Sequence, residues 1–315
     1  MVSFEPLKYL LLSGEGIFDF PLQERFQNLD KITTFGSSGN IAYRTTPTHP
    51  QAVLQLLGIG ILNDQQEDSD AFIERYGSLS IHIISNSEQF IEQARVISDR
   101  GCKKHKFTHI DTHFTLDEIS TNLLNFAKES LILDDPDSRA LFHVVFVHIT
   151  QQIDGPNPLN GEQILHLFES IISKLISSQY LHLPSQDWVK IQPNKDSQLM
   201  NELFIRSGAL SAVVPKAHAH SLWVSVIGGE VLSNEPEEEP LLRQSFHMAF
   251  GKDISSELSN KRLCFLHFCP GHTRIDDIRE FNSQSLQKGC WKTLLAEQFL
   301  SEIAYRLHCP PKFGA

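Results

Sequence analysis

Short apolar runs alternate with stretches of helical periodicity along most of the chain. The apolar runs contain many β-branched residues and predict buried strands at Tyr9–Leu12, Ile32–Phe35, Leu79–Ile84, Ala140–Ile149, Leu222–Ile227 and Arg262–Phe268, with a further run at Asn40–Arg44. Apolar residues at helical spacing predict helices at Gln51–Leu57, Glu88–Ser98, Leu116–Ser130, Gly161–Ser178, Ser197–Ile205 and Trp291–Arg306. Asn160 with Gln163 forms a capping-box pattern at the start of one of these helices.

The alternation of strands and helices predicts an α/β fold with a mixed, mostly parallel sheet between helical layers. Ligands of such sheets bind beyond the carboxyl ends of the strands. No internal repeat or low-complexity tract divides the sequence, so we expect a single domain over residues 1–315 with elaboration on its N-terminal side. The irregular, proline-containing stretch 181–194 is the best candidate for a domain boundary or a lid loop.

Composition narrows the class of protein. A hydrophobic content of 41% and a charged content of 21% are typical of a soluble globular protein, and no apolar run is long enough for a membrane span. The 5 cysteines have no paired spacing, which indicates reduced thiols in a cytosol-like compartment. The N-terminus does not have the pattern of a signal peptide. A net charge of −11 argues against general nucleic-acid binding, which needs a basic surface.

The stretch Val226–Phe246 carries the most suggestive chemistry. Gly228 and Gly229 are predicted to end a strand and to let backbone approach a ligand, and the carboxylates of Glu237–Glu239 follow after a short loop. Pro240 predicts that a helix begins there, and its dipole would favour ionised carboxylates by about 0.3–1 kcal/mol. Repulsion among adjacent carboxylates favours keeping one of them protonated, which is the combination that glycosyl-bond cleavage requires. The alternative interpretation is a solvated acidic loop.

This stretch resembles the signature of macrodomains of the poly(ADP-ribose) glycohydrolase type, in which three glycines, a short spacer and Gln-Glu-Glu lead into a helix. Gly228-Gly229-Glu230 stands in the place of the glycine triplet, Val231–Pro236 in that of the spacer, and Glu237-Glu238-Glu239 in that of Gln-Glu-Glu. Glu230 and Glu237 depart from the pattern, and Val224 and Ser225 stand where the family usually has an asparagine. These departures leave open either a divergent hydrolase or a pocket that binds without turnover.

The resemblance implies a macrodomain-like α/β/α sandwich that cleaves the glycosidic bond between ADP-ribose and a modified protein. By position, Glu239 matches the acid/base of the family, and Glu238 matches the carboxylate that binds the ribose hydroxyls. Gly228 and Gly229, together with Glu230, Val231 and Glu237, would contact ADP-ribose. If the register slips by one residue, Glu237 would be the operative acid.

The resemblance also extends to a second turn, and it implies which cofactors, partner and compartment to expect. The last strand-to-helix turn of the family contains Gly-Cys-Gly and wraps the pyrophosphate, and Gly289 and Cys290 match its first two residues. No metal or cofactor is expected, since ADP-ribose is itself the substrate or product, and the partner would be an ADP-ribosylated protein. Divergent macrodomains also occur among proteins that bacteria send into host cells, so delivery into a host as an effector is a further expectation.

Other classes of function remain open. The chain could be a catalytically inert ADP-ribose reader, or an interaction domain whose acidic loop meets a basic partner without any nucleotide. Cys290 at a helix N-terminus could be a nucleophile, although no protease signature surrounds it. The turn Gly36–Gly39 could cradle a phosphate or be a plain hairpin. His218 and His220 could line the pocket or lie on the surface.

A zinc site is a further alternative for the segment from Cys102 to His113. It also contains His105, His109 and Asp111. Their spacing fits no closed structural zinc site, and the alternation around Ile110 predicts a strand instead.

Overall fold

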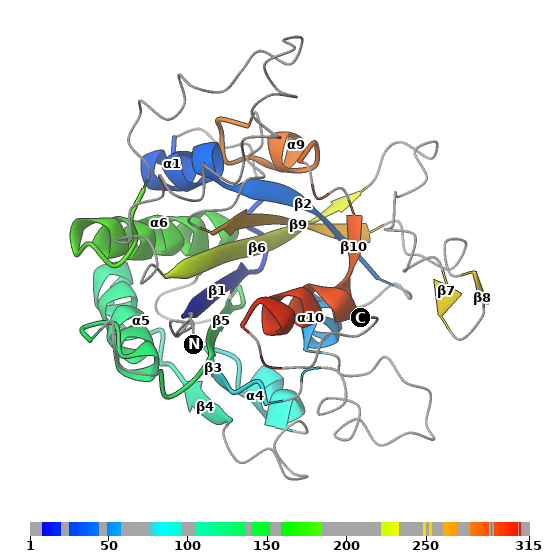
Figure 1. The fold of residues 1–315 in the computed structure, drawn as a ribbon. Coiled ribbons are helices and arrows are strands. Elements are labelled where there is room, and N and C mark those ends of the chain that lie inside the picture. Colours follow the sequence, from blue (N-terminus) through cyan, green and yellow to red (C-terminus); the bar gives the residue numbers. More distant parts are fainter. Residues whose placement is uncertain are drawn as a thin grey trace, which may run out of the picture.

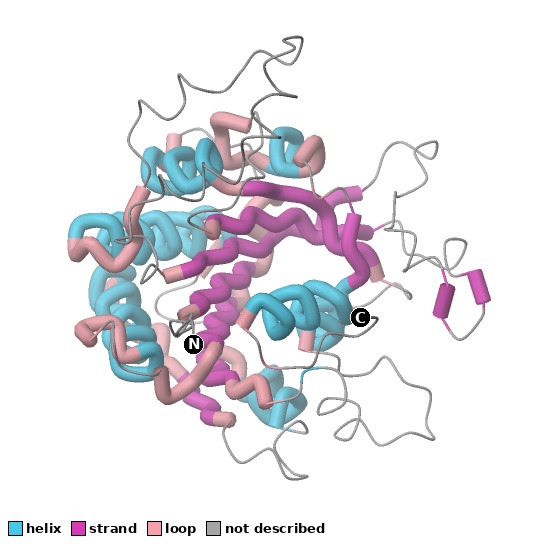
Figure 2. The backbone as a smooth tube through the Cα atoms, in the orientation of Figure 1, coloured by secondary structure: helices cyan, strands magenta, loops and turns pink. Residues whose placement is uncertain are grey.

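The computed structural model describes residues 8–19, 25–43, 49–57, 76, 78–95, 105–135, 140–151, 159–183, 222–232, 248–249, 252–253, 261–269, 278–289, 291, 293–307 and 309. These residues form an 8-stranded sheet between two layers of helices, and a separate 2-stranded ribbon (Figures 1 and 2). The strands of the sheet are β1 (Tyr9–Gly14), β2 (Ser37–Ala42), β3 (Ile81–Ser85), β4 (Lys106–His109), β5 (Val144–Ile149), β6 (Trp223–Leu232), β9 (Lys261–Phe268) and β10 (Thr293–Leu295). The ribbon consists of β7 (Met248–Ala249) and β8 (Lys252–Asp253).

The sheet is mixed but mostly parallel. Its strand order is β10-β2-β9-β6-β1-β5-β3-β4, and every neighbouring pair is parallel except those that β9 makes with β2 and β6. β1 therefore lies at the centre of the sheet, between β6 and β5. This arrangement confirms the fold class that the alternating pattern predicts.

The helices cover both faces of the sheet. They are α1 (Gln27–Phe35), α2 (His49–Leu56), α4 (Glu88–Ala94), α5 (Leu116–Leu131), α6 (Gly161–Ser177), α9 (Ser283–Leu286) and α10 (Ala296–Arg306). One apolar core joins the sheet to α1, α5, α6 and α9, and a second core joins it to α2, α4 and α10. None of the helices in the described part of the chain is long and apolar enough to cross a bilayer.

Alternation along β1 shows how the two cores are built. Leu10 and Leu12 belong to the core on the α6 side, whereas Tyr9 and Leu11 belong to the core on the α10 side, and all four are buried. Because both faces of the central strands are covered, these strands read in the sequence as unbroken apolar runs.

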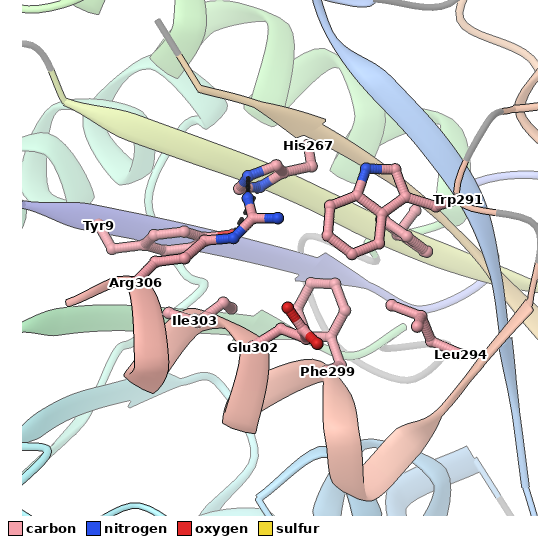
Figure 3. A pocket seen from close by; sticks show the side chains of 9 residues that line it. Tyr9, His267, Trp291, Leu294, Phe299, Glu302, Ile303 and Arg306 are labelled. Carbon is pink, nitrogen blue, oxygen red and sulfur yellow. Dashed lines mark hydrogen bonds between the residues drawn. The ribbon is translucent and has the colours of Figure 1, made fainter. Parts of the chain in front are cut away.

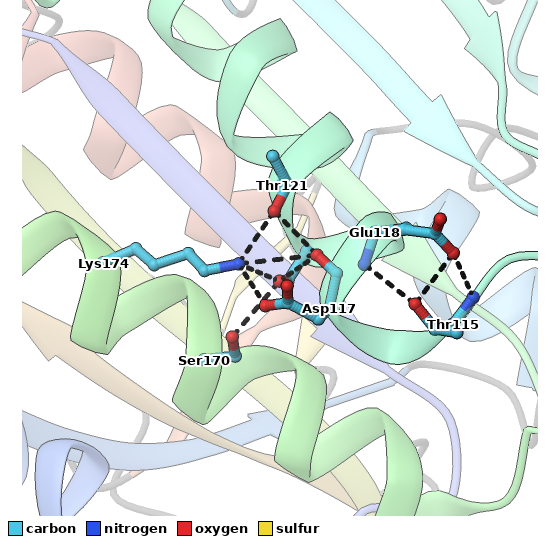
Figure 4. A network of polar contacts seen from close by, with 7 residues as sticks. Thr115, Asp117, Glu118, Thr121, Ser170 and Lys174 are labelled. Atoms are coloured by element: carbon cyan, nitrogen blue, oxygen red, sulfur yellow. Dashed lines mark hydrogen bonds and ion pairs between the residues drawn. The ribbon is translucent and has the colours of Figure 1, made fainter.

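The two longest helices begin at capping boxes and are tied together by a lysine. Thr115 and Glu118 cap α5, and Asn160 and Gln163 cap α6, which confirms the capping box predicted at Asn160. Lys174 of α6 reaches α5, where its Nζ donates to Asp117 Oδ1 at 2.7 Å, to Ser120 Oγ at 2.7 Å and to Thr121 Oγ1 at 2.9 Å (Figure 4). These polar contacts connect α5 with α6, whose buried apolar residues belong to the same core.

Near the N-terminus, two predictions are wrong. Ile32–Phe35 is the last turn of α1 and not a strand, because Leu29 and Ile32 pack at helical spacing against the core that contains α6. Ser37–Gly39 is not a turn but the start of β2, antiparallel to Phe265–His267 of β9. The proposed phosphate cradle at Gly36–Gly39 therefore does not exist.

Near the C-terminus and in the histidine-rich segment, element boundaries also differ from the prediction. A short strand, β10, precedes the last helix, which begins at Ala296 and not at Trp291. β4 ends at His109, so Asp111 and His113 lie beyond the strand. The helices predicted at Ser197–Ile205 and from Pro240, as well as His218 and His220, lie outside the described residues, as does most of the stretch 181–194.

Candidate functional site

The carboxyl ends of four parallel strands meet at one edge of the sheet. Gly14, the last residue of β1, is the register partner of Ile149 at the end of β5 and of Gly228 in β6. Ser85, the last residue of β3, pairs with His148 of β5. Ligands of open α/β sheets bind beyond such strand ends. The edge that contains Gly228 is therefore the candidate functional site.

The glycine pair lies inside β6 and does not end it. The strand was predicted to stop at Ile227 but continues to Leu232, with a β-bulge between Gly228 and Glu230. Gly229 has a φ of 65°, a left-handed conformation that favours glycine. β1 stops at Gly14, so beyond Gly228 β6 pairs only with β9 among the described strands.

Side chains from the loop after β1 fill the space that the glycines leave. A Cβ atom at Gly228 would lie 2.1 Å from Ile17 Cδ1, and one at Gly229 would lie 2.5 Å from Phe18 Cδ2. Gly14 is similar, because its Cβ would lie 2.7 Å from Ile17 Cγ2. Close packing of this loop therefore requires glycine at these positions, whether or not a ligand binds.

Polar side chains at the same edge extend the pairing between strands. Oε2 of Glu15 accepts a hydrogen bond from the backbone N–H of Gln151 at 2.9 Å. Oδ1 of Asn86 accepts from the backbone N–H of Thr150 at 2.8 Å, and its Nδ2 donates to the Thr150 carbonyl at 2.9 Å. His109 Nε2 lies 3.2 Å from the Asn86 carbonyl oxygen. These contacts join the chain segments that follow β1, β3 and β5 with the last residue of β4.

The sequence interpretation did not single out Glu15, Asn86, Thr150 and Gln151 as a group. Each lies one or two residues after the end of a parallel strand, and such strands end at a common edge. That position was the signal that could have identified them.

The structure brings together only part of the predicted site. Gly228, Gly229, Glu230 and Val231 lie in β6 at the carboxyl edge. Gly289 packs elsewhere, because a Cβ atom there would lie 2.1 Å from the carbonyl oxygen of Ser38 in β2. β9 separates β2 from β6, which places those two strands about 10 Å apart.

The predicted catalytic acids Glu238 and Glu239, together with Glu237 and Cys290, lie outside the described residues. The geometry of the site therefore concerns the glycines and their surroundings.

The described residues contain no group of three or more His, Cys, Asp and Glu side chains that could hold a metal ion. In the segment considered for zinc, His105 packs beside β3, where burial lowers its pKa to about 4. Burial also raises the pKa of the Cys264 thiol to about 12 and that of the Cys309 thiol to about 11. These two cysteines therefore stay protonated near neutral pH and are not activated nucleophiles.

A second polar cluster lies on the α10 side of the sheet, at the opposite ends of the same strands. Tyr9 begins β1, Ser225 lies early in β6, and His267 lies near the end of the antiparallel strand β9. Tyr9 Oη is 2.6 Å from Ser225 Oγ and 2.9 Å from His267 Nδ1, and Ser225 Oγ is 3.0 Å from the same nitrogen. Arg306 of α10 donates from Nη1 to His267 Nε2 at 2.9 Å (Figure 3).

This cluster borders a cavity of about 10 Å³, which has room for a single water-sized group. The walls of the cavity are mostly aromatic and aliphatic, with Glu302 and Arg306 as its charged members. No local sequence pattern indicates the cluster, because its members come from four segments that are far apart in the chain.

Comparison with known proteins identifies the fold and no activity. The chain matches no protein-family model, and no curated protein is similar to it in sequence. Among solved structures, the PH0037 protein from Pyrococcus horikoshii aligns with a TM-score of 0.51 at 11% identity, covering 100% of both chains. The two proteins share a fold. The lipoteichoic acid synthase LtaP from Listeria monocytogenes aligns with a TM-score of 0.44 at 8% identity, over 99% of this chain and 74% of its own, which is too low to support an inference.

Proposed function

We propose that the chain is an ADP-ribosyl hydrolase that acts at the carboxyl edge of β6. The observation that supports this proposal is the position of the glycine pair. Gly228 and Gly229 lie next to the end of β1, at the edge where α/β sheets bind ligands. The acidic segment Glu237–Glu239 follows Leu232, the last residue of β6, after a short stretch of chain.

The proposed reaction is hydrolysis of the glycosidic bond between the distal ribose and an acceptor side chain. Glu239 donates a proton to the leaving acceptor atom and then takes a proton from the attacking water. The water oxygen bonds to the anomeric carbon, so the products are ADP-ribose and the unmodified acceptor. Glu238 binds the ribose hydroxyls and stabilises the positive charge that develops on the sugar.

Charge restricts how the substrate is oriented in this scheme. A carboxylate at Glu230 would repel the diphosphate of ADP-ribose, so the diphosphate is expected to lie away from that residue. The side of Gly228 that faces α6 is filled by Ile17, so the sugar approaches beyond the strand end and not over the face of the sheet.

The direct test combines a binding measurement and a turnover measurement on the full chain. We expect ADP-ribose to bind in calorimetry, and we expect the chain to release ADP-ribose from a mono-ADP-ribosylated protein. The absence of release would overturn the proposal, whether or not ADP-ribose binds.

A second candidate function is binding without turnover. The altered triplet favours it, because Glu230 stands where the resembled motif has its third glycine. The closed packing of Ile17 and Phe18 beside the glycines favours a different alternative, an interaction domain without a nucleotide site. An ADP-ribose reader would bind ADP-ribose and release none from the modified protein. An interaction domain would bind no ADP-ribose and would meet a basic partner in a salt-sensitive manner.

A further inference from the structure

The first residues of β9 lie at the edge of the sheet where the parallel strands end. β9 runs antiparallel to both of its neighbours (Figure 1). Arg262, near the start of β9, is the register partner of Ala42 at the end of β2 and of Val231 near the end of β6. This pairing lies beyond Gly228, which is paired with the last residue of β1. Arg262 therefore belongs to the same edge as the candidate site.

Alternation along β9 determines the face of the sheet on which Arg262 lies. Leu263 belongs to the core on the α10 side, and Cys264 belongs to the core on the α6 side. Because side chains two residues apart lie on the same face of a strand, Arg262 is on the α6 side. Gly228 is the register partner of Cys264, and Ile17 packs over it on that face. Arg262 therefore shares a face with the loop that covers the glycines.

The charge of Arg262 is half-buried and has no counter-charge in the described part of the chain. Its Nε atom is buried without a hydrogen-bond partner, and no described carboxylate forms an ion pair with its guanidinium. Burial lowers the pKa of the guanidinium, with no opposing effect of an acidic group. On β2, the paired residue Ala42 has only a methyl group to offer.

Such an arginine is unusual in this chain. Acidic residues outnumber Lys and Arg by 38 to 27, so a carboxylate partner would be easy to provide. Arginine stays protonated in proteins, and a charge that is partly removed from water is costly unless an opposite charge accompanies it. Cations in such positions are normally paired. An anion supplied from outside the chain would fill this need.

We propose that Arg262 is the anion-binding residue of the carboxyl edge and that it binds the diphosphate of the ligand. The assignment rests on the proposed function for the identity of that ligand, ADP-ribose. A guanidinium presents two parallel N–H donors that match two phosphate oxygens. The attraction is stronger at a half-buried site than in open solvent, because less water screens it. A net charge of −11 repels a diphosphate, so the site needs a local cation of this kind.

A role in ligand binding makes a distinct prediction for stability. Arg262→Met removes the charge and keeps an unbranched apolar side chain. Because it removes a half-buried charge without a partner in the described residues, we expect the variant to be at least as stable as the unmodified chain in urea unfolding. An arginine with a structural partner would leave that partner unpaired, and the variant would be less stable. A loss of stability in Arg262→Met would overturn the assignment.

Calorimetry on the full chain, with ADP-ribose and with inorganic pyrophosphate, tests the binding role. We expect Arg262→Gln to raise the Kd of both ligands by about 10- to 100-fold, because hydrogen bonds between charged groups are lost. Arg262→Lys keeps the charge but not the paired donors, so it should fall between the two.

Arg95→Gln is the matched control for the change in net charge. Arg95 is exposed at the end of α4, where its Nη1 lies 3.5 Å from Glu92 Oε1, and α4 packs on the opposite face of the sheet from Arg262. Arg95→Gln should bind both ligands as the unmodified chain does. An equal loss in Arg95→Gln and Arg262→Gln would show an effect of net charge and overturn the assignment.

The pyrophosphate measurement separates a failure of this assignment from a failure of the proposed function. Pyrophosphate binding that depends on Arg262, in a chain that releases no ADP-ribose, would reject the hydrolase and support the anion site. Release of ADP-ribose with an unchanged KM in Arg262→Gln would support the hydrolase and overturn the assignment. The assignment is also overturned if the unmodified chain binds neither ligand, or if Arg262→Gln binds both with unchanged affinity.

Discussion

Gly14 of β1 and Gly228 of β6 are register partners, and both lack the side chain that would collide with Ile17. The two glycines lie on the face of the sheet that packs against α6, and the loop after β1 turns back over them. The same glycine that resembles part of a ligand-binding motif is thus also required by packing. A loss of function on its substitution would not by itself identify a binding role.

Substituting Gly228 by alanine should destabilise the fold. The added Cβ would lie 2.1 Å from Ile17 Cδ1, deep in the core, and overpacking of this kind costs about 1–3 kcal/mol. Urea unfolding should show the loss. The double variant Gly228→Ala/Ile17→Val should recover part of it, because the two side chains compete for the same space. Unchanged stability together with lost ADP-ribose binding would instead assign Gly228 a role in ligand contact.

Glu169 of α6 should stabilise α1. Phe26, the residue just before α1, makes no side-chain capping bond. The Glu169 carboxylate instead accepts hydrogen bonds from the backbone N–H groups of Asn28 and Leu29 at 2.8 and 2.9 Å. Glu169→Gln removes the charge and one of the two acceptors, so we expect the free energy of unfolding to fall by about 1 kcal/mol. Chemical denaturation of this variant measures the loss.

Glu162→Gln is the matched control for Glu169→Gln. Glu162 is exposed in the first turn of the same helix and has the same charge. Its substitution should change the free energy of unfolding by no more than about 0.5 kcal/mol. Equal effects of the two substitutions would show that the loss at Glu169 reflects charge alone and not capping of α1.

The layered fold could be predicted from the sequence because its central strands are buried on both faces. Strands such as β5 therefore appear in the sequence as continuous apolar runs, and the capping box at Asn160 predicts where α6 begins. The errors came from short segments. Ile32–Phe35 is too short for its periodicity to distinguish a strand from the last turn of a helix. It is helical because Leu29 and Ile32 pack together into the core that contains α6.

The candidate site was predictable only where its residues are consecutive. Gly228 and Gly229 stood out because they adjoin a predicted strand, and the structure does place them at the carboxyl edge. The resemblance also assigned Gly289 to this site. A glycine is required at position 289 because the residue lies in close contact with Ser38 of β2, which is two strands away from β6. The cluster of Tyr9, Ser225, His267 and Arg306 depends on register across the sheet, which a single sequence does not reveal.

Stability should fall in mild acid because of buried neutral histidines. Burial, with the charge of Lys106 nearby, lowers the pKa of His82 to about 4. The ring lies 2.6 Å from Ser130 Oγ and 2.8 Å from Thr108 Oγ1. The unfolded chain takes up this proton near pH 6.5, but the folded chain does so only near pH 4. The free energy of unfolding should therefore fall as the pH decreases from about 6.5 to 4, by roughly 3 kcal/mol for this one residue.

Urea unfolding at several pH values checks the contribution of His82. His82→Gln should be less stable at pH 7.5, because it leaves buried hydroxyls poorly matched, but its stability should depend less on pH between 6.5 and 4. His113→Gln is the control, since His113 is exposed and its substitution measures the effect of losing a histidine that is not buried. A pH dependence that is the same in His82→Gln and in the unmodified chain would contradict the assignment.

The catalytic proposal makes a sharp distinction among three adjacent carboxylates. Glu239→Gln should reduce release of ADP-ribose from a modified protein by a factor of about 10² to 10⁴, the range typical of losing a general acid, while ADP-ribose binding stays nearly unchanged. Glu238→Gln should weaken binding as well as turnover, because Glu238 is assigned to the ribose hydroxyls. Glu237→Gln restores the residue type that the resembled motif has at this position, so it should retain turnover.

If Glu237→Gln is the inactive variant and Glu239→Gln is active, the register of the motif is shifted by one residue. If all three variants release ADP-ribose at the rate of the unmodified chain, these carboxylates are not catalytic, and the acidic segment is better explained as a surface for a basic partner.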